Sequence, residues 1–247
     1  MKIGKLSLAL LATALSALTF VGVAPAAAAS PVQSTPDSDV GTQIIGGGFA
    51  SNAPWAARMF NNGQQRCSAT IIAPTYILSA RHCVSGTSAS ALSFRIGSLD
   101  QLSGGQTASG VSYTVHPSAD LAIIRLNRSV SATYSPLGTT SNVYVGQTVQ
   151  VYGWGATCTN QPEINCQSRY LKYANVVVTS VSCRDYIGGI AVCARYGNGI
   201  PAGGDSGGPM FASGRQVGVA STSDRATRTA YTNITRYRSW IQSNAGV

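Results

Sequence analysis

The chain has 247 residues, which is enough for one large domain or two small ones. Charged residues make up only 10% of it and hydrophobic residues 44%, a composition that excludes an intrinsically disordered chain. The net charge of +9 comes almost entirely from arginines that form no long run, so we interpret it as a solvated basic surface rather than a nucleic-acid site. A preference for acidic substrates or polyanionic surfaces is the alternative.

Residues 1–29 have the pattern of a secretory signal. Lys2 and Lys5 precede an apolar stretch at residues 6–23, and Ala27-Ala28-Ala29 offers a cleavage site of small residues. A membrane anchor is the alternative, because about 18 apolar residues can span a bilayer, but a glycine, a proline and the alanine run favour cleavage. The signal predicts a secreted, extracellular protein that is free of the membrane once the signal is removed. The polar residues 30–43 then form a short pro-segment.

From residue 45 onward the sequence consists of short apolar or alternating runs, interrupted by glycine, asparagine, serine and proline. Short strands separated by frequent turns are typical of an all-β sandwich or barrel. Only residues 235–245, which include Tyr237, Trp240 and Ile241, predict a helix. The runs with the clearest strand pattern are 69–72, 76–78, 92–96, 122–126 and 148–152.

Six cysteines in an exported chain predict three disulfides. They can pair in many ways, so their spacing alone leaves the pairing open. No Cys-x-x-Cys motif occurs and the chain has only two histidines, so we expect neither a metal site nor another cofactor.

One serine lies among four glycines in Gly203-Gly204-Asp205-Ser206-Gly207-Gly208-Pro209. Glycines at this density let the backbone turn tightly and direct successive N–H groups at one point, which suits an oxyanion. The Ser206 hydroxyl needs a base to become a nucleophile. The candidate bases are His82, which follows an apolar run, and His116, which precedes a proline, and Asp120 follows as an acid.

Four motifs resemble those of the chymotrypsin family of trypsin-like serine proteases, and together they span nearly all of the chain after residue 43. The order of His82, Asp120 and Ser206 is that of this family and differs from the orders in subtilisins and α/β-hydrolases. The signal and the composition resemble those of bacterial members. The four motifs are Ile44-Ile45-Gly46-Gly47, Ser79-Ala80-Arg81-His82-Cys83, Asp120-Leu121-Ala122-Ile123 and Gly204-Asp205-Ser206-Gly207-Gly208-Pro209.

The resemblance implies an all-β fold of two antiparallel six-stranded β-barrels, at about residues 44–140 and 141–234, followed by a C-terminal helix at about 235–245. The site would lie in the cleft between the barrels, with His82 and Asp120 from the first barrel and Ser206 from the second. The disulfides that the resemblance implies are Cys67–Cys83, Cys158–Cys166 and Cys183–Cys193.

The same resemblance implies a role for each motif residue. Ser206 would be the nucleophile, His82 the general base and Asp120 the acid that holds the imidazole ring. The N–H groups of Gly204 and Ser206 would bind the oxyanion, and Ser221 would hydrogen-bond Asp120. The structural alternatives are a turn serine, a packed histidine and a turn-capping aspartate, and the second histidine of the chain is given no role.

Ile44 and Asp205 match the residues that activate members of this family. Cleavage before Ile44 would free an α-amino group, which would pair with the carboxylate of Asp205 because a buried carboxylate needs a partner. The alternative is that Ile44 merely begins a buried strand. Gln43 precedes the cleavage point where many relatives have Arg or Lys, so a trypsin-like activating protease is not expected.

The specificity pocket departs from that of trypsins. Ile200 stands where trypsins have the aspartate of the pocket floor, so cleavage after basic residues is not expected. Ala202 stands where many relatives have a cysteine, which removes the usual bridge beside the pocket. Ser223 and Thr229 replace wall glycines and should narrow the mouth, which favours small or medium apolar residues before the scissile bond. Asp224 lies near the mouth and is the alternative, as a shallow site for a basic side chain.

These observations predict a secreted serine endopeptidase that acts on peptides or proteins, has no nucleic-acid partner and is a monomer. A non-catalytic binding protein on the same fold is the alternative, although such proteins usually lose a residue of the catalytic set. The remaining acids Asp100 and Asp185, like Asp224, match no motif and are predicted to be solvated.

Overall fold

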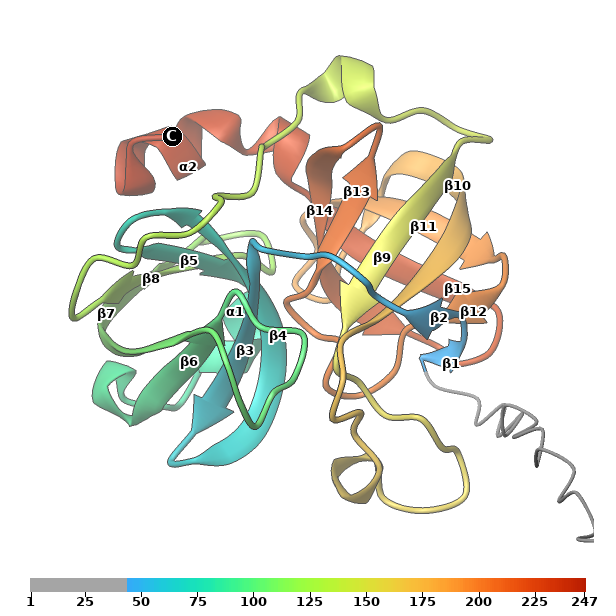
Figure 1. The fold of residues 1–247 in the computed structure, drawn as a ribbon. Helices are drawn as coiled ribbons and strands as arrows, with labels where there is room; N and C mark the ends of the chain where they lie inside the picture. Colours follow the sequence, from blue (N-terminus) through green and yellow to red (C-terminus); the bar gives the residue numbers. More distant parts are fainter. Residues whose placement is uncertain (1–43) are drawn as a thin grey trace, which may run out of the picture. The chain divides into compact units, whose positions relative to one another are not determined.

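A computed structural model describes residues 44–247, which form mostly β-strands and end in a short helix (Figure 1). The expected signal at residues 1–29 and the pro-segment at 30–43 lie outside the described residues. In the described part of the chain, no helix is long and apolar enough to cross a membrane.

The first six long strands close into an antiparallel barrel in the order β3-β4-β5-β8-β7-β6. Strand β6 shows why these residues form strands: Leu92, Phe94 and Ile96 are buried, and the residues between them are only partly buried. This alternation fills the barrel with apolar side chains. The strands are β3 (Ala56–Asn61), β4 (Gln64–Ala73), β5 (Tyr76–Ser79), β6 (Leu92–Ile96), β7 (Gln106–Val115) and β8 (Ala122–Leu126).

The second barrel is also antiparallel and six-stranded, in the order β11-β15-β14-β13-β9-β10, and it closes because β10 also pairs with β11. Its interior holds a separate cluster of apolar side chains, among them Val151, Val176, Met210 and Tyr231. Two closed six-stranded barrels are the architecture that the resemblance implied. The strands are β9 (Thr148–Gly153), β10 (Lys172–Arg184), β11 (Ile190–Tyr196), β13 (Pro209–Ala212), β14 (Arg215–Ser223) and β15 (Arg228–Asn233).

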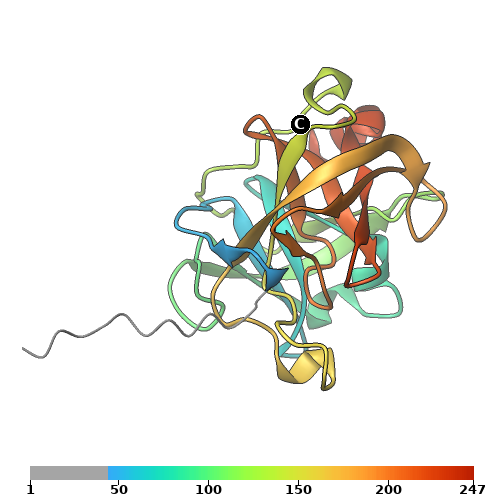
Figure 2. The same ribbon diagram turned by 90° about the vertical axis from the view of Figure 1, so that its right-hand side faces the viewer.

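The start of the described chain belongs to the second barrel, although we expected residues from 44 onward in the first. Strand β1 (Ile45–Gly46) pairs with β12 (Gly199–Ile200), and β2 (Gly48–Phe49) pairs with β10 (Figures 1 and 2). Each of these strands is only two residues long, which is too short to show an alternating pattern in the sequence. The pairing brings residue 44 to the segment that leads into the loop of Ser206.

The C-terminal helix α2 (Arg238–Ala245) returns from the second barrel to the first. It begins later than residue 235, because Ile234–Arg236 forms a separate 3-10 turn (η4). Its buried residues Ile241 and Ala245 pack with the core of the first barrel. Gly246 ends the helix in a left-handed conformation, with φ of 76°.

Three disulfides join Cys67 to Cys83, Cys158 to Cys166 and Cys183 to Cys193, which is the pairing that the resemblance implied. The first ties β4 to the one-turn helix α1 (Arg81–Val84), and the third ties β10 to β11. They span 16, 8 and 10 residues, and a disulfide that closes a loop of about 15 residues stabilises the folded chain by roughly 3 kcal/mol.

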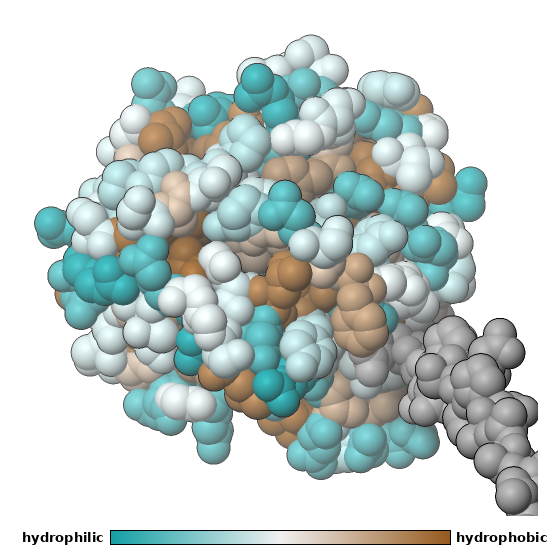
Figure 3. Space-filling view, viewed as in Figure 1, coloured by the Kyte–Doolittle hydropathy of each residue, from teal (hydrophilic) through white to brown (hydrophobic). Residues whose placement is uncertain are grey.

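On the face drawn in Figure 3 most of the surface is hydrophilic or intermediate, with hydrophobic residues in separate patches.

Candidate active site

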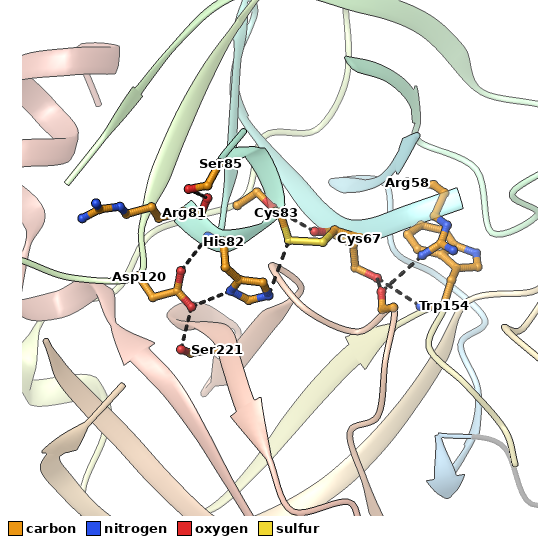
Figure 4. Close-up of a disulfide and its surroundings, with 12 residues drawn as sticks. Arg58, Cys67, Arg81, His82, Cys83, Ser85, Asp120, Trp154 and Ser221 are labelled. Atoms are coloured by element: carbon orange, nitrogen blue, oxygen red, sulfur yellow. Dashed lines mark hydrogen bonds and ion pairs between the residues drawn. A yellow bond between two sulfur atoms is a disulfide. The ribbon is translucent and has the colours of Figure 1, made fainter. Parts of the chain in front are cut away.

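His82 lies on helix α1, directly after strand β5 ends at Ser79. Its backbone N–H donates to Oδ1 of Asp120 at 2.9 Å, and its ring Nδ1 lies 2.7 Å from Oδ2 of the same carboxylate (Figure 4). Two contacts to one carboxylate fix both the helix and the ring. The disulfide Cys67–Cys83 anchors the residue next to His82, and Nε2 of the imidazole lies 3.9 Å from Sγ of Cys83.

Asp120 is fully buried in the turn that precedes β8. The Ser221 hydroxyl donates to its Oδ2 at 2.7 Å, as the resemblance implied. Burial by itself would raise the pKa of the Asp120 carboxyl, but the hydrogen bonds and charge of His82 and the bond from Ser221 outweigh it and hold the pKa below its ordinary value. The carboxylate can therefore orient the ring and stabilise an imidazolium.

His82 and Ser206 line the same pocket, which has a volume of about 310 Å³. Among residues 44–247 the structure contains no hydrogen bond between Nε2 of His82 and Oγ of Ser206. In unliganded enzymes such a contact is often long and shortens when substrate binds. The structure thus brings His82 and Ser206, from two barrels, to one pocket, and the buried Asp120 is bonded to His82 outside the lining.

The direction of the N–H groups of Gly204 and Ser206 follows from the bonds of the carbonyls that precede them. The carbonyl of Gly203 accepts from Ala156 N at 2.7 Å, and the carbonyl of Asp205 accepts from Gly208 N at 2.9 Å. In a trans peptide the N–H points opposite to the preceding carbonyl, so the two N–H groups have the opposite direction. Gly204 has φ of 97°, a backbone conformation that residues other than glycine rarely adopt. Neither N–H donates a hydrogen bond to another of the described residues, so both can bind an oxyanion.

The carboxyl of Asp205 points the other way, into the second barrel, where it is fully buried. Its Oδ1 accepts from Gly155 N at 2.7 Å, and its Oδ2 accepts from Ala202 N at 2.9 Å. Burial raises the pKa of Asp205 to about 6, against the opposing effect of these amides and of the charges on Arg58 and Lys172. No described residue forms an ion pair with this carboxyl, although the charges of Arg58 and Lys172 act on it.

Sequence reasoning missed Arg58, a fully buried arginine of strand β3. Its Nη1 donates to the carbonyl of Gly204 at 3.2 Å, next to the Ser68 hydroxyl, which donates to the same oxygen at 2.9 Å. Its Nε donates to Gln101 at 2.9 Å, and Nη2 contacts Gln167. Burial lowers the pKa of Arg58 to about 9, although the charge of Asp205 opposes this. A lone arginine in an apolar strand was the available signal.

Ser223 and Thr229 line the pocket beside Ser206, and Ile200 is not among the lining residues. Ile200 is fully buried in β12, and the neighbouring Pro201 and Ala202 line the pocket in its place. The position of Ile200 at the pocket floor stays a prediction.

Arg225 also lines the pocket, and sequence reasoning missed it. Its guanidinium pairs with Glu163, from the loop closed by the disulfide Cys158–Cys166, in two contacts, one of them 3.1 Å. The bond to Arg225 lowers the pKa of Glu163. The pair joins the disulfide loop to the wall of the pocket.

Asp224, the alternative cation site, uses its carboxylate within its own loop. It accepts from the backbone N–H groups of Ala226, Thr227 and Arg228 and from the Thr227 hydroxyl, at 2.7–2.9 Å. These bonds hold its pKa well below the ordinary value. Asp224 lines a second pocket rather than the one with Ser206, so it offers no counter-charge to a substrate there.

Asp185 is 6% exposed, so the prediction that it is solvated was wrong. It lies in the loop between β10 and β11, and its Oδ2 accepts from the backbone N–H of Asp120 at 2.9 Å. The sequence did not indicate this contact, because 65 residues separate the two acids. Asp224 is exposed, as predicted, and Asp100 is partly buried.

The ring of His116 packs edge-on against Tyr237, with centroids 4.7 Å apart. Cys67, His82 and Cys83 place their ligand atoms within 4.8 Å of one another. Both sulfurs are in a disulfide, so no thiolate is available to bind a metal at this point.

Over the described part of the chain, sequence and structure comparisons find similar proteins with a trypsin-like fold. A family model described as Trypsin matches residues 44–241. Trypsin delta from Drosophila melanogaster is 32% identical over 227 residues, covering 82% of this chain and 88% of that protein. A mutant of human heparin binding protein has a TM-score of 0.72 at 25% identity and covers 81% of this chain and 96% of its own. The mouse serine protease neuropsin has a TM-score of 0.68 at 28% identity, with coverages of 80% and 98%.

Proposed function

The chain belongs to the trypsin family, and on that premise we propose that it is a secreted serine endopeptidase, with Ser206 as nucleophile, His82 as general base and Asp120 as the orienting acid. The observation that carries the proposal is the pair of bonds from His82 to the buried Asp120, in the same pocket as Ser206. The sequence signal and three disulfides support export to an oxidising environment.

In the proposed reaction, Oγ of Ser206 attacks the carbonyl carbon of the scissile peptide while Nε2 of His82 takes its proton. The N–H groups of Gly204 and Ser206 bind the oxygen that becomes negative, and each such donor lowers the barrier by about 3–4 kcal/mol. His82 then gives the proton to the leaving amine as the C–N bond breaks, which leaves an acyl group on Ser206. Water, deprotonated by His82, attacks that ester and restores the enzyme.

We propose that substrate lies beside β14 as an added strand. Ser221, Thr222 and Ser223, at the end of β14, line the pocket next to Ser206. Main-chain hydrogen bonds to such a strand bind a peptide with little dependence on its sequence. Selectivity would then come from the residue that enters the pocket.

For that residue we propose a small or medium apolar side chain. The wall contains Ala202, Ser223 and Thr229, and among the described residues that line the pocket there is no carboxylate. A Lys or Arg side chain would meet Arg225 instead of a counter-charge, and placing an unpaired cation there is unfavourable.

We also propose activation by cleavage before Ile44. Its side chain is 1% exposed, and its φ of 37° is strained for a β-branched residue. Cleavage removes the peptide bond that defines this torsion and creates an ammonium group. The buried Asp205 carboxyl, with its raised pKa, is a suitable acceptor for that charge.

A cleavage profile tests these proposals. The protein beginning at Ile44 is incubated with a peptide library, next to the same protein with Ser206→Ala. We expect cleavage after Ala, Val or Leu that is absent from the variant. Cleavage that persists in the variant would remove Ser206 from the mechanism, and cleavage after Arg or Lys would contradict the proposed pocket.

A non-catalytic binding protein remains the second candidate, because the heparin binding protein mutant shares this fold. The net charge of +9 fits a polyanionic partner. Against it stands the complete set of His82, Asp120 and Ser206. A folded protein with a free Ile44 amino group and no hydrolysis of any library peptide would favour the binding role.

A further inference from the structure

We propose that Asp185 is a positioning residue for the catalytic set: it fixes the backbone of Asp120 and places a second negative charge behind the Asp120–His82 pair. This inference rests on the proposed function, because it assigns a role within that reaction. No motif in the sequence indicates it, and the role depends on the loop that the disulfide Cys183–Cys193 closes.

The carboxylate of Asp185 has a full set of donors. Oδ2 accepts from Asp120 N at 2.9 Å and from the Thr232 hydroxyl at 2.9 Å, while Oδ1 accepts from Ile187 N at 3.0 Å and Gly189 N at 2.7 Å. All four partners are donors, which is the environment of an ionised carboxylate. None of the described residues forms an ion pair with Asp185, so its charge acts on its surroundings without a partner.

These contacts hold Asp120 from the second barrel. Asp185 accepts from the backbone N–H of Asp120, and the Thr232 hydroxyl, when not turned to Asp185, reaches the carbonyl of Asp120 at 3.1 Å. Asp120 belongs to the first barrel and both partners to the second. The pair of barrels is thus joined at the residue that orients His82. A carboxylate held in this way keeps its bonds to His82 in a single geometry.

The same loop also orients the Ser221 hydroxyl. The backbone N–H of Tyr186 donates to Oγ of Ser221 at 3.0 Å, and that hydroxyl donates to Oδ2 of Asp120 at 2.7 Å. Because Oγ accepts from Tyr186, its single hydrogen is left to point at Asp120. Gly189 permits this close approach, since a Cβ there would lie 2.6 Å from the Cβ of Ala119 and 2.7 Å from Oδ2 of Asp185.

The charge of Asp185 acts on the charged and titratable groups around it. His116 responds to it: burial lowers the pKa of His116, the charge of Asp185 raises it, and the charge of Arg81 lowers it. Arg81 donates to the carbonyl of His116 at 3.2 Å. The ring of Tyr186 lies edge-on to His82, with centroids 6.2 Å apart.

At the end of the loop that contains Asp185, the Tyr237 hydroxyl accepts from Ile190 N at 2.7 Å. In the described residues, Asp120 is the only other carboxylate in the hydrogen-bond network that contains Asp185, Tyr186 and Ser221. The carboxylate of Asp185 accepts from the backbone N–H of Asp120, and a negative charge held at this point favours a positive imidazolium on His82. Because the imidazolium of His82 forms in the transition state, the second charge should favour catalysis.

A purely structural alternative is that Asp185 only caps its own turn, through Ile187 and Gly189. Both roles predict lower stability when the carboxylate is removed. Only the positioning role predicts that the titration of His82 moves. The chain has two histidines, so both imidazoles can be followed separately by NMR.

The test compares Asp185→Asn with Asp100→Asn, each on a Ser206→Ala background. Asp100 is the matched control, because it caps a turn through Leu102 N at 2.9 Å just as Asp185 does through Ile187 N. We expect Asp185→Asn to lower the titration midpoints of both histidines by roughly half a pH unit or more, and Asp100→Asn to leave them unchanged. A folded Asp185→Asn protein with an unmoved His82 midpoint would overturn the proposal.

Kinetics with Ser206 present supply the second readout. In Asp185→Asn the acidic limb of the kcat/KM profile should move to lower pH and kcat should fall several-fold, with KM changed by no more than about twofold. An inactive unsubstituted enzyme would refute the proposed function instead, and the NMR titration would still test Asp185. If Asp185→Asn does not fold, Thr232→Val should lower kcat and Thr232→Ser should restore it, and equal kcat values in both would overturn the proposal.

Discussion

The buried carboxyl of Asp205 should make the stability of the uncleaved chain depend on pH, and cleavage before Ile44 should remove that dependence. Burial raises the pKa of Asp205 from 3.8 to about 6. In this interval the folded protein holds a proton that the unfolded chain has lost, so folding is favoured at low pH. The contribution is fully present below pH 3.8 and is lost as the pH rises through about 6.

The size of the effect follows from the two pKa values. Their difference corresponds to about 3 kcal/mol of unfolding free energy, of which about 2 kcal/mol falls between pH 4.5 and pH 7. Burial lowers the pKa of Lys172 to about 8 and that of Arg58 to about 9, so neither group titrates in this interval. Burial also lowers the pKa of His116, which gives the opposite slope, but that contribution is common to all forms compared.

The assay is urea unfolding between pH 4.5 and 7 of two forms on a Ser206→Ala background, one beginning at residue 30 and one at Ile44. Each is measured with and without Asp205→Asn. In the longer form, the stability difference between parent and Asp205→Asn should change by about 2 kcal/mol across the interval. In the shorter form it should change little, because a free ammonium group lowers the carboxyl pKa. The same pH dependence in both forms would refute the reasoning.

Three further predictions follow from the site. Arg58→Met should lower the unfolding free energy by about 3–5 kcal/mol, because it removes a buried charge next to Asp205 and a donor to the Gly204 carbonyl; a loss below about 1 kcal/mol in urea would contradict this. Glu163→Gln should free the Arg225 guanidinium and increase cleavage after Asp and Glu in a peptide library, so an unchanged profile would argue against a role for the pair. EDTA should leave hydrolysis unaffected, and a loss that Ca²⁺ or Zn²⁺ restores would reveal an ion site.

The fold and the three candidate catalytic residues could be predicted because each leaves a local trace. Short alternating runs such as Leu92–Ile96 record burial directly. His82, Asp120 and Ser206 each lie in a short motif whose order along the chain is informative. The structure adds their geometry, which the motifs do not contain.

Features set by contacts between distant segments could not be predicted. Asp185 is one acid in a polar loop until the fold brings it to Asp120, and Arg58 meets Gly204 across 146 residues. The lining of the pocket was also missed in part, because no motif marks Arg225 as a wall residue. Arg225 and Glu163 meet across 62 residues for the same reason.

Trapping of an acyl-enzyme tests the central claim most directly. The protein beginning at Ile44 is mixed with an activated ester at mildly acidic pH, where deacylation is slow, and its intact mass and peptide map are measured. The account predicts one acyl group per chain, on the peptide that contains Ser206, and none in Ser206→Ala or His82→Ala. No acylation of a folded protein, or an acyl group on another residue, would contradict it.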